Sequence, residues 1–554
     1  MFHLLQYQYR EMVYERFTEY FIVLLIFALS FTSTSESIIV KSKVGLIRGL
    51  RALDGNYSMY LGIPYARVNE SNPFGESLAY PHFETEFEAF NDTAICPQQE
   101  EFNLTIVGNL DCLHLNIYVP DAVAKAAKLP VLVNIFGGQA RIGFAGRYIY
   151  GPKYLVEHDI IFITFNYRVG PYGFFCLSTP EVSGNQGYKD QVKALRWIRD
   201  NIEAFGGDSN KITVSGHSSG ATSLDYIVHT LNDENLFDKI ILQSGNAYSA
   251  TIEIREPDDG LPIKLANKLG YNASSLDDAL HYLTITDPKL VINASVSLDP
   301  LYSTCLENTS DDIQKIPPDY PINLKLPMIT NLSILIGNTN AETIYFFDPL
   351  SSDDMKKLDL FKHHLNLDLK DEVYMKEMED IVYQFYFGET EQSLLSKNEA
   401  MKFSADFYYI YSSKITLKKY LEAGAKNVYY FIFSYDGGRN FVKYRTHISR
   451  PGASHADEQG YLYDMSIFNT TLSENDALMI KRMTTLWTNF VKYGNPTPAT
   501  TELLPLQWLP YHQSTELYMN IDLEMSLRTG PYFRRMAFWD LFFDINEKFI
   551  KGVK

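Results

Sequence analysis

Five short apolar runs constrain the fold of this chain more than any other feature. They lie at residues 131–136, 160–165, 212–215, 240–244 and 334–337. None of them alternates strictly between apolar and polar residues, as a half-buried strand would. Such runs are typical of strands that are buried on both faces, in a parallel sheet covered by helices.

A helix between two of these strands is predicted by residues 189–207, KDQVKALRWIRDNIEAFGG. Its apolar side chains recur at steps of three and four, which gives one buried face, and the final two glycines supply a stop. Strands that alternate with helices are typical of an α/β architecture. We therefore expect a large, mostly parallel central sheet with helices on both faces.

Two less regular stretches, residues 256–327 and residues 348–414, interrupt this pattern. We expect them to be insertions that roof the sheet near the carboxyl ends of its strands, where open α/β sheets bind ligands. No internal repeat or flexible linker divides the chain, so we predict a single domain over residues 36–554. The second insertion is expected to be helical.

Charge excludes one class of partner. The formal net charge of the 554-residue chain is -18, spread without an acidic block. Binding of nucleic-acid phosphates needs a basic face, so we expect no nucleic-acid partner.

The N-terminus predicts a secretory signal peptide over residues 1–35. Its apolar run at residues 21–31 has 11 residues, whereas a membrane-spanning helix needs about 20. Small polar residues follow the run, which places the cut before Glu36. Met12 is an alternative start, and an uncleaved signal anchor is the alternative interpretation.

Secretion is also supported by nine Asn-x-Ser/Thr sequons, which mark candidate N-glycosylation sites in a secreted chain. They are Asn56, Asn69, Asn91, Asn103, Asn272, Asn293, Asn308, Asn331 and Asn469. The C-terminal residues show neither a retention tetrapeptide nor a hydrophobic tail for a lipid anchor. We expect an extracellular protein without a stable membrane span.

The stretch KITVSGHSSGATS, residues 211–223, predicts a strand, a tight turn and a helix. In this setting, Gly-x-Ser-x-Gly is the pattern of a nucleophile elbow, with Ser218 at its apex between Gly216 and Gly220. Ser219 would offer its backbone N–H at the start of the helix. An ordinary glycine-serine turn is the alternative, because a serine attacks only when a base and a carboxylate assist it.

The chain resembles the carboxylesterase/cholinesterase family of α/β-hydrolases from residue 38 to residue 539, and its phrasing is most similar to the insect carboxylesterases. The matching segments are YLGIPYA (60–66), DCLHLNIYVP (111–120), NYRVGPYGF (166–174), GNQGYKDQVKALRWIRDNIEAFGGD (184–208), ILQSGNA (241–247) and TNFVKYGNPTP (488–498).

This resemblance implies a catalytic triad. Ser218 would be the nucleophile, Glu342 in IGNTNAET the acid, and His455 in GASHADEQG the base. Without the resemblance, Glu342 reads as a solvated loop carboxylate and His455 as a surface histidine. The family usually has glycine after the acid, and Thr343 stands there instead.

The expected oxyanion hole departs from the family pattern. The family often has His-Gly-Gly-Gly after the strand that is predicted here at residues 131–136. At this place the chain has FGGQA, with Gln139 in place of the third glycine. By resemblance, the N–H groups of Gly138, Gln139 and Ser219 would stabilise the oxyanion. One missing donor typically costs about 100- to 1,000-fold in rate. Gln139 would therefore either impair the site or merely narrow it.

The resemblance also implies a disulfide between Cys96 and Cys112, and it leaves Cys176 and Cys305 open. Cholinesterases carry the choline-binding indole between the first two cysteines, and this chain has no tryptophan there, which argues against a choline ester. No cofactor is implied, and no metal-binding pattern is found. His217 stands where the family usually has glutamate, and we expect it to tune the charge of the pocket.

Two functions compete at this point. The first is a secreted serine carboxylesterase, which acts on a small-molecule ester through an acyl-enzyme. The second is a catalytically weak or silent binding or adhesion protein of the neuroligin-like branch. The complete set of triad residues favours the first, and Gln139 is the feature that favours the second. The natural ester and the oligomeric state are left open.

Overall fold

The computed structural model describes residues 37–121, 128–231, 234–250, 254–300, 302–307, 315–361, 364–388 and 396–553. The expected signal peptide at residues 1–35 and the sequon at Asn308 lie outside the described residues.

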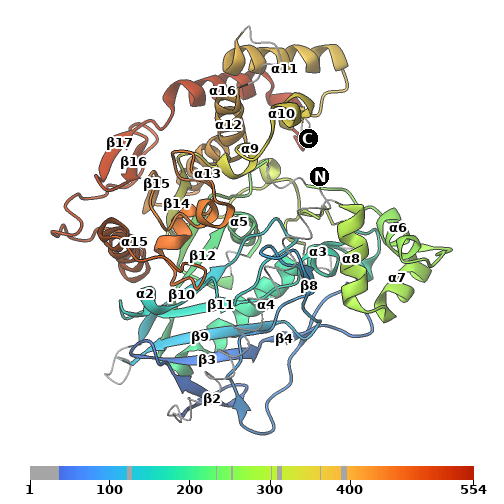
Figure 1. Cartoon of the computed structure of the whole chain (residues 1–554), viewed down its shortest axis with the longest axis vertical. Helices are drawn as coiled ribbons and strands as arrows, with labels where there is room; N and C mark the ends of the chain where they lie inside the picture. Colours follow the sequence, from blue (N-terminus) through green and yellow to red (C-terminus); the bar gives the residue numbers. More distant parts are fainter. Residues whose placement is uncertain are drawn as a thin grey trace, which may run out of the picture.

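A 13-stranded sheet runs through the described part of the chain, in the order β1-β2-β3-β9-β11-β10-β12-β13-β14-β15-β16-β17, with β6 beside β2 (Figure 1). Its middle is parallel. The parallel strands are β10 (Leu129–Ile135), β11 (Ile161–Phe165), β12 (Gly207–His217), β13 (Lys239–Gln243), β14 (Ser333–Thr339), β15 (Val428–Phe433) and β16 (Leu517–Ile521). All five strands predicted from apolar runs are therefore confirmed.

The two margins of the sheet are antiparallel, apart from the parallel pairing of β6 with β2. Their strands are β1 (Ser37–Ser42), β2 (Gly45–Arg51), β3 (Tyr57–Pro64) and β9 (His114–Pro120) on one side, and β17 (Ser526–Thr529) on the other. The shorter strands are β4 (Ala66–Arg67), β5 (Leu78–Ala79), β6 (Phe87–Glu88), β7 (Gln98–Gln99) and β8 (Ile106–Val107).

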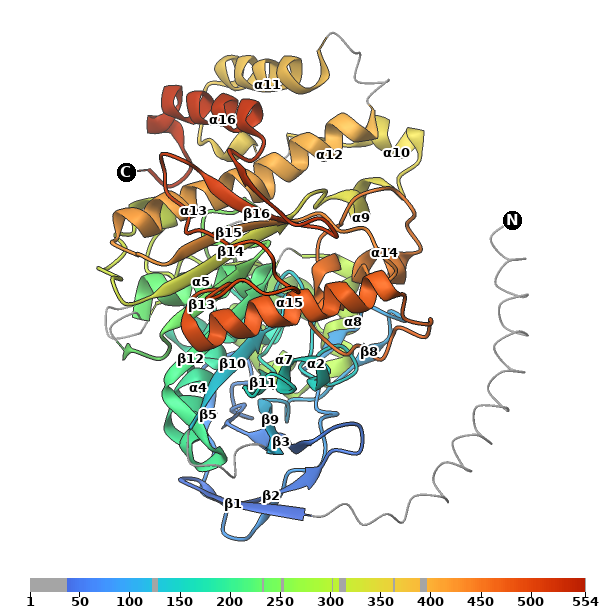
Figure 2. The same cartoon turned by 90° about the vertical axis from the view of Figure 1, so that its left-hand side faces the viewer.

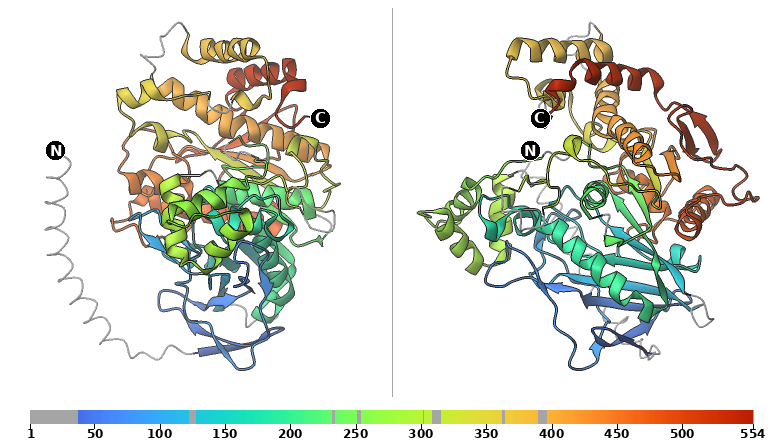
Figure 3. Two further views of the ribbon diagram at one scale, coloured as in Figure 1. Left: turned by 90° about the vertical axis from the view of Figure 1, so that its right-hand side faces the viewer. Right: turned by 180° about the vertical axis from the view of Figure 1, so that it is seen from behind.

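Helices cover both faces of the sheet, as predicted. Alternate residues of one strand enter two separate cores: Ile240 and Leu242 pack on one side, and Ile241 packs on the other. The first side is covered by α4 (Gln186–Asn201) and α5 (Ser219–Leu231), and the second by α2 (Lys153–Val156) and α15 (Glu474–Tyr493). Helix α15 crosses in front of the sheet in Figure 2, and α4 is visible from behind in Figure 3.

Helix α4 confirms the predicted helix and its stop. It continues into a 3₁₀ turn, Ile202–Phe205, and ends at Gly206, whose φ of 84° lies in the left-handed region that glycine adopts readily. The helix begins three residues earlier than predicted, because Asn185 adopts a left-handed conformation just before it. The side chain of Asn185 is held by the backbone of Cys305, because the Cys305 N–H donates to Asn185 Oδ1 at 2.7 Å.

The two insertions are helical and lie apart from each other (Figure 1). The first carries α6 (Gly260–Lys268), α7 (Leu276–Ile285) and α8 (Pro288–Leu298), and the second carries α10 (Ser352–Lys357), α11 (Glu372–Phe387), α12 (Lys397–Ala405), a π-helix (Asp406–Ile410) and α13 (Tyr411–Glu422). The remaining α-helices are α3 (Gly170–Phe174), α9 (Ile344–Phe347), α14 (Phe441–Thr446) and α16 (Phe533–Ile545). None of the helices in the described ranges is long and apolar enough to cross a membrane.

Two disulfides tie loops to this framework. Cys96 is bonded to Cys112. Cys176 is bonded to Cys305, a pairing that the sequence left open, and it joins the segment after α3 to the first insertion.

Candidate active site

Ser218 occupies the sharp turn between β12 and α5. Strand β12 ends at His217 and α5 begins at Ser219, so a single residue makes the turn. Its φ is +54°, a region that residues with a side chain rarely adopt, and its N–H donates to Gln243 O at 2.8 Å. Such backbone strain costs about 1–3 kcal/mol and clusters at functional sites.

Three glycines make this turn sterically possible. A Cβ on Gly216 would lie 2.5 Å from Gly220 O, and a Cβ on Gly220 would lie 2.4 Å from Ile135 O. A Cβ on Gly245 would approach Ser218 O to 2.1 Å. Because all three obstacles are backbone atoms, larger residues would force the strand and the helix apart.

Glu342 and His455 are joined by a direct hydrogen bond. Glu342 follows β14 and is fully buried, and its Oε2 lies 2.7 Å from His455 Nδ1. The other carboxylate oxygen, Oε1, accepts from Ser244 Oγ at 2.7 Å and from Thr339 N at 2.8 Å. The His455 N–H also donates to Glu342 O at 3.0 Å. The carboxylate is therefore held on both oxygens, and it orients the imidazole through one of them.

Asp457 holds the loop that carries His455. Its carboxylate accepts hydrogen bonds from Ser454 N at 2.6 Å and from Val442 N at 2.9 Å. Burial raises the pKa of this carboxyl to about 6, although the hydrogen bonds from Lys443 N and Ser454 N oppose the rise. The buried carboxylate of Asp457 thus ties the loop to α14.

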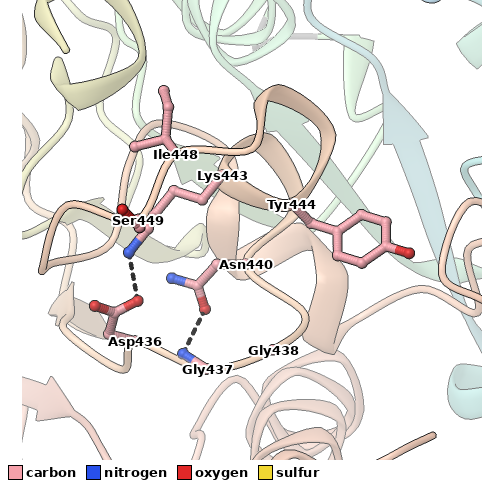
Figure 4. A pocket seen from close by; sticks show the side chains of 8 residues that line it. All are labelled: Asp436, Gly437, Gly438, Asn440, Lys443, Tyr444, Ile448 and Ser449. Atoms are coloured by element: carbon pink, nitrogen blue, oxygen red, sulfur yellow. Dashed lines mark hydrogen bonds and ion pairs between the residues drawn. The ribbon is translucent and has the colours of Figure 1, made fainter. Parts of the chain in front are cut away.

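A polar cavity of about 280 Å³ lies beside the same loop (Figure 4). Lys443 forms an ion pair with Asp436 in its wall, and Nζ of this lysine also donates to Gly452 O at 2.9 Å. Asp436 accepts from Gly452 N at 3.0 Å. None of Ser218, Glu342 and His455 lines this cavity. The contacts in its wall therefore hold the loop in place and are not part of the candidate catalytic site.

Three aromatic rings surround His455. The ring centroid of His217 lies 4.6 Å from that of His455, and the rings of Tyr409 and Tyr345 lie at 5.0 and 5.9 Å. Tyr409 comes from the π-helix of the second insertion, which therefore reaches the candidate site. Only 12% of the His455 side chain is exposed. Such π-turns often occur at functional sites, and Tyr409 is a candidate site residue that the sequence did not reveal.

The backbone of the expected oxyanion loop runs past Ser218. A Cβ on Gly137 would lie 2.8 Å from the Cβ of Ser218. Gly138 has a φ of +130°, and Gln139 has a φ of +55° with an exposed side chain. Within the described ranges, no residue accepts a hydrogen bond from the N–H of Gly138 or Gln139. Ser219 is the first residue of α5, where an N–H has no acceptor within the helix.

Hydrogen bonds from Gln98 and the stacking of Phe136 hold this loop in place. Gln98 clamps Gly143 with both side-chain atoms: Nε2 donates to Gly143 O at 2.8 Å, and Oε1 accepts from Gly143 N at 2.7 Å. Nε2 of Gln98 also donates to Cys96 O at 3.0 Å, which links the loop to the first disulfide. Phe136 stacks on Tyr167 with ring centroids 4.2 Å apart. The sequence revealed Phe136 as a replacement for the family's histidine, but not its aromatic partner.

The three predicted triad residues each follow the carboxyl end of a strand in the parallel part of the sheet, and a direct contact joins Glu342 to His455. Ser218 follows β12, Glu342 follows β14, and His455 lies in a loop after β15. In the described part of the chain, no group of three His, Cys, Asp or Glu residues is arranged to hold a metal ion. The arrangement orients the His455 imidazole through Glu342, and it places Ser218, which is partly buried, in a sharp turn with backbone donors nearby that are free within the described ranges.

Comparison with known proteins assigns this architecture. The profile of the Carboxylesterase family matches residues 36–539. Juvenile hormone esterase of Heliothis virescens is 29% identical over 502 residues, covering 85% of this chain and 88% of that protein. Neuroligin-3 of Mus musculus is 26% identical over 581 residues, covering 90% of this chain and 68% of that protein.

A solved structure shares the fold. Juvenile hormone esterase from Manduca sexta, with OTFP covalently attached, superposes with a TM-score of 0.79 at 25% identity, over 93% of this chain and 100% of that chain. The expected α/β-hydrolase fold is confirmed. The chain therefore belongs to the carboxylesterase family, and it is an ester hydrolase.

Proposed function

We propose that the chain is a secreted carboxylesterase that hydrolyses a small-molecule ester through a Ser218–His455–Glu342 triad. Ser218 Oγ attacks the ester carbonyl while His455 takes the proton of the hydroxyl. The tetrahedral intermediate then expels the alcohol, which receives that proton from His455, and an acyl-serine remains. Water, activated by His455, attacks the acyl-enzyme, and the acid leaves with Ser218 restored.

The observation that carries this proposal is the 2.7 Å hydrogen bond between Glu342 Oε2 and His455 Nδ1. A base becomes effective when a third group fixes its tautomer and stabilises the imidazolium that forms. Here the carboxylate is buried and has two further donors, so it stays in place while His455 exchanges protons. His455 Nε2 is left for the serine.

Developing negative charge on the substrate oxygen would be stabilised by the N–H groups of Gly138, Gln139 and Ser219. Such donors act strongly because they are fixed before the reaction and are shielded from water. The φ of +55° at Gln139 lies within the left-handed region that a non-glycine residue can reach. The glutamine therefore does not by itself exclude a complete oxyanion hole.

The substrate is a carboxylic ester of undetermined type. Relatives named juvenile hormone esterase make an ester of that kind a candidate. The loop between Cys96 and Cys112 contains no tryptophan, so a choline ester is not favoured.

A silent binding protein is the second candidate, because Gln139 replaces a glycine of the oxyanion loop and neuroligin-3 is among the relatives. Labelling with a fluorophosphonate probe separates the two functions. We expect the probe to label the wild type and Ser219→Ala but not Ser218→Ala, since only the turn residue presents its hydroxyl to substrate. Labelling that survives Ser218→Ala, or a wild type that does not react, would refute the triad.

A further inference from the structure

Two buried polar side chains, His217 and Glu458, lie near each other in the candidate site. His217 Nε2 lies 3.9 Å from Glu458 Oε1, and the side chain of Glu458 is 1% exposed. Within the described residues, neither His217 Nε2 nor Glu458 Oε2 has a hydrogen-bond partner. Buried polar groups without partners are rare in native proteins, and each of them calls for an explanation.

Glu458 is surrounded by neutral donors. Its Oε1 accepts from Gln243 Nε2 at 2.9 Å and from Gln459 Nε2 at 3.0 Å. Burial raises the pKa of Glu458 to about 7, and the charge of nearby Glu342 adds to the rise. Glu458 therefore holds a proton below neutral pH, and a protonated carboxyl is a hydrogen-bond donor.

His217 has the complementary character. Burial lowers the pKa of His217 well below its usual value, and repulsion from His455 adds to this effect. The ring is therefore uncharged, and its nitrogen without hydrogen is an acceptor. Both side chains are therefore uncharged below neutral pH, and the 3.9 Å between His217 Nε2 and Glu458 Oε1 is a close approach that is longer than a hydrogen bond.

His455 contacts one member of this pair, because the ring centroids of His217 and His455 lie 4.6 Å apart. The titratable groups that face His455 are Glu342 at Nδ1, the rings of His217, Tyr345 and Tyr409, and the more distant Glu458. Around Glu458 they are Glu342, His217, His455 and Tyr463. With the His217–Glu458 pair uncharged, the Glu342 carboxylate at Nδ1 is the acidic group in direct contact with His455.

We propose that His217 and Glu458 are positioning residues, and that their uncharged pair beside His455 sets the pH at which His455 becomes a base. This inference rests on the proposed triad, in which His455 must be unprotonated to act. It gives His217 a role that a buried structural histidine would not have: the residue keeps a second negative charge away from the base.

The test replaces His217 by Glu and, as the matched neutral control, by Gln. In His217→Glu, the pair carries at least one negative charge beside His455. An opposite charge at this distance stabilises the imidazolium and moves its titration by about one pH unit or more. We expect the acidic limb of the kcat/KM profile for p-nitrophenyl acetate to move to higher pH by this amount in His217→Glu, and to stay in place in His217→Gln.

A second readout does not depend on turnover. Nuclear magnetic resonance of ¹³Cε1-labelled histidine follows the midpoint of His455, assigned by its loss in His455→Gln. The same spectra should show a perturbation of His217 with a midpoint near pH 7, which disappears in Glu458→Gln. This variant keeps the shape of the side chain and serves if His217→Glu does not fold.

The proposal is overturned if His217→Glu leaves the midpoint of His455 unchanged, if His217→Gln moves it equally far, or if the perturbation near pH 7 survives Glu458→Gln. Failure of the triad looks different. In that case fluorophosphonate does not label Ser218, while the histidine titrations can still follow the expected pattern.

Discussion

Ser244 Oγ donates a hydrogen bond of 2.7 Å to Glu342 Oε1, on the carboxylate oxygen that His455 does not use. Ser244 directly follows β13 and has a φ of +50°. The strained residue therefore places its hydroxyl beside the buried carboxylate, and it fixes the direction in which Glu342 presents Oε2 to the imidazole.

Ser244→Ala should lower kcat/KM for p-nitrophenyl esters by about tenfold, because a hydrogen bond to a charged group contributes about 1.5–3 kcal/mol and each 1.4 kcal/mol in the barrier is tenfold in rate. Ser223→Ala is the matched control. Ser223 is also fully buried, but its hydroxyl donates to Gly220 O within α5 at 2.8 Å. Equal losses in both variants would show that Ser244 has only a structural effect.

Glu458 should make stability depend on pH. Its pKa is raised from 4.5 to about 7 in the folded protein, so the folded state binds the proton more tightly than the unfolded state. The stabilisation is complete below about pH 4.5 and is lost as the pH rises to about 7, with a total of about 3 kcal/mol.

Glu458→Gln removes this proton and retains the amide oxygen as an acceptor for Gln243 and Gln459. We expect the free energy of unfolding of the wild type to fall relative to that of Glu458→Gln between pH 4.5 and 7, and the difference to stay constant above pH 8. Urea unfolding at several pH values measures it. A difference between the two proteins that does not vary with pH would contradict the assignment.

Secretion predicts a processed, glycosylated chain. Of the eight sequons in the described residues, seven present an exposed asparagine, and Asn69 is partly buried. We expect protein from insect-cell medium to begin at Glu36 and to lose mass on treatment with an N-glycosidase. A cytosolic form without residues 1–35 should show no such loss. An intact N-terminus on membrane-bound, unglycosylated protein would contradict this prediction.

The parallel core of the sheet could be predicted because a strand that is buried on both faces is a continuous apolar run in the sequence. The N-terminal strands give a weaker sequence signal. Residues of β1 alternate between exposed and partly buried, and β3 contains Gly62 with a φ of +72°, so neither stretch is a continuous apolar run of the kind that predicts a strand here. The pairing of β1 with β2 and of β3 with β9 is set by the folded sheet rather than by local sequence.

The candidate site shows the same division. Ser218 could be found from the strand, the turn and the helix around it, whereas Glu342 and His455 required the resemblance to a family. The contact between Ser244 and Glu342 joins residues 98 positions apart. Tyr409 contacts His455 from the π-helix of the second insertion, 46 positions earlier in the chain. No local pattern specifies either contact.

Gln139 is the remaining departure from the family pattern, and the backbone there distinguishes its two interpretations. Gln139 and Ala140 have φ values of +55° and +59°, so two consecutive non-glycine residues adopt the left-handed region. The Gln98 clamp on Gly143 and the 2.7 Å hydrogen bond from Gly170 N to Ala140 O hold the loop in this form. The N–H of Gln139 can then serve the oxyanion, and we expect its exposed side chain to narrow the entrance.

Gln139→Gly should therefore widen the range of bulky esters that are hydrolysed and change turnover of p-nitrophenyl acetate by less than about tenfold, since the donors themselves are retained. Lys153→Gly, an exchange at a partly buried position on a short helix remote from Ser218 in the chain, controls for a general loosening of the fold. Steady-state kinetics on a series of p-nitrophenyl esters of increasing acyl length measures both effects. If the glutamine has cost a donor, glycine should instead raise turnover of every ester by about 100-fold or more. Such a uniform gain would show that the oxyanion hole of the natural chain is impaired, and it would favour the silent binding protein.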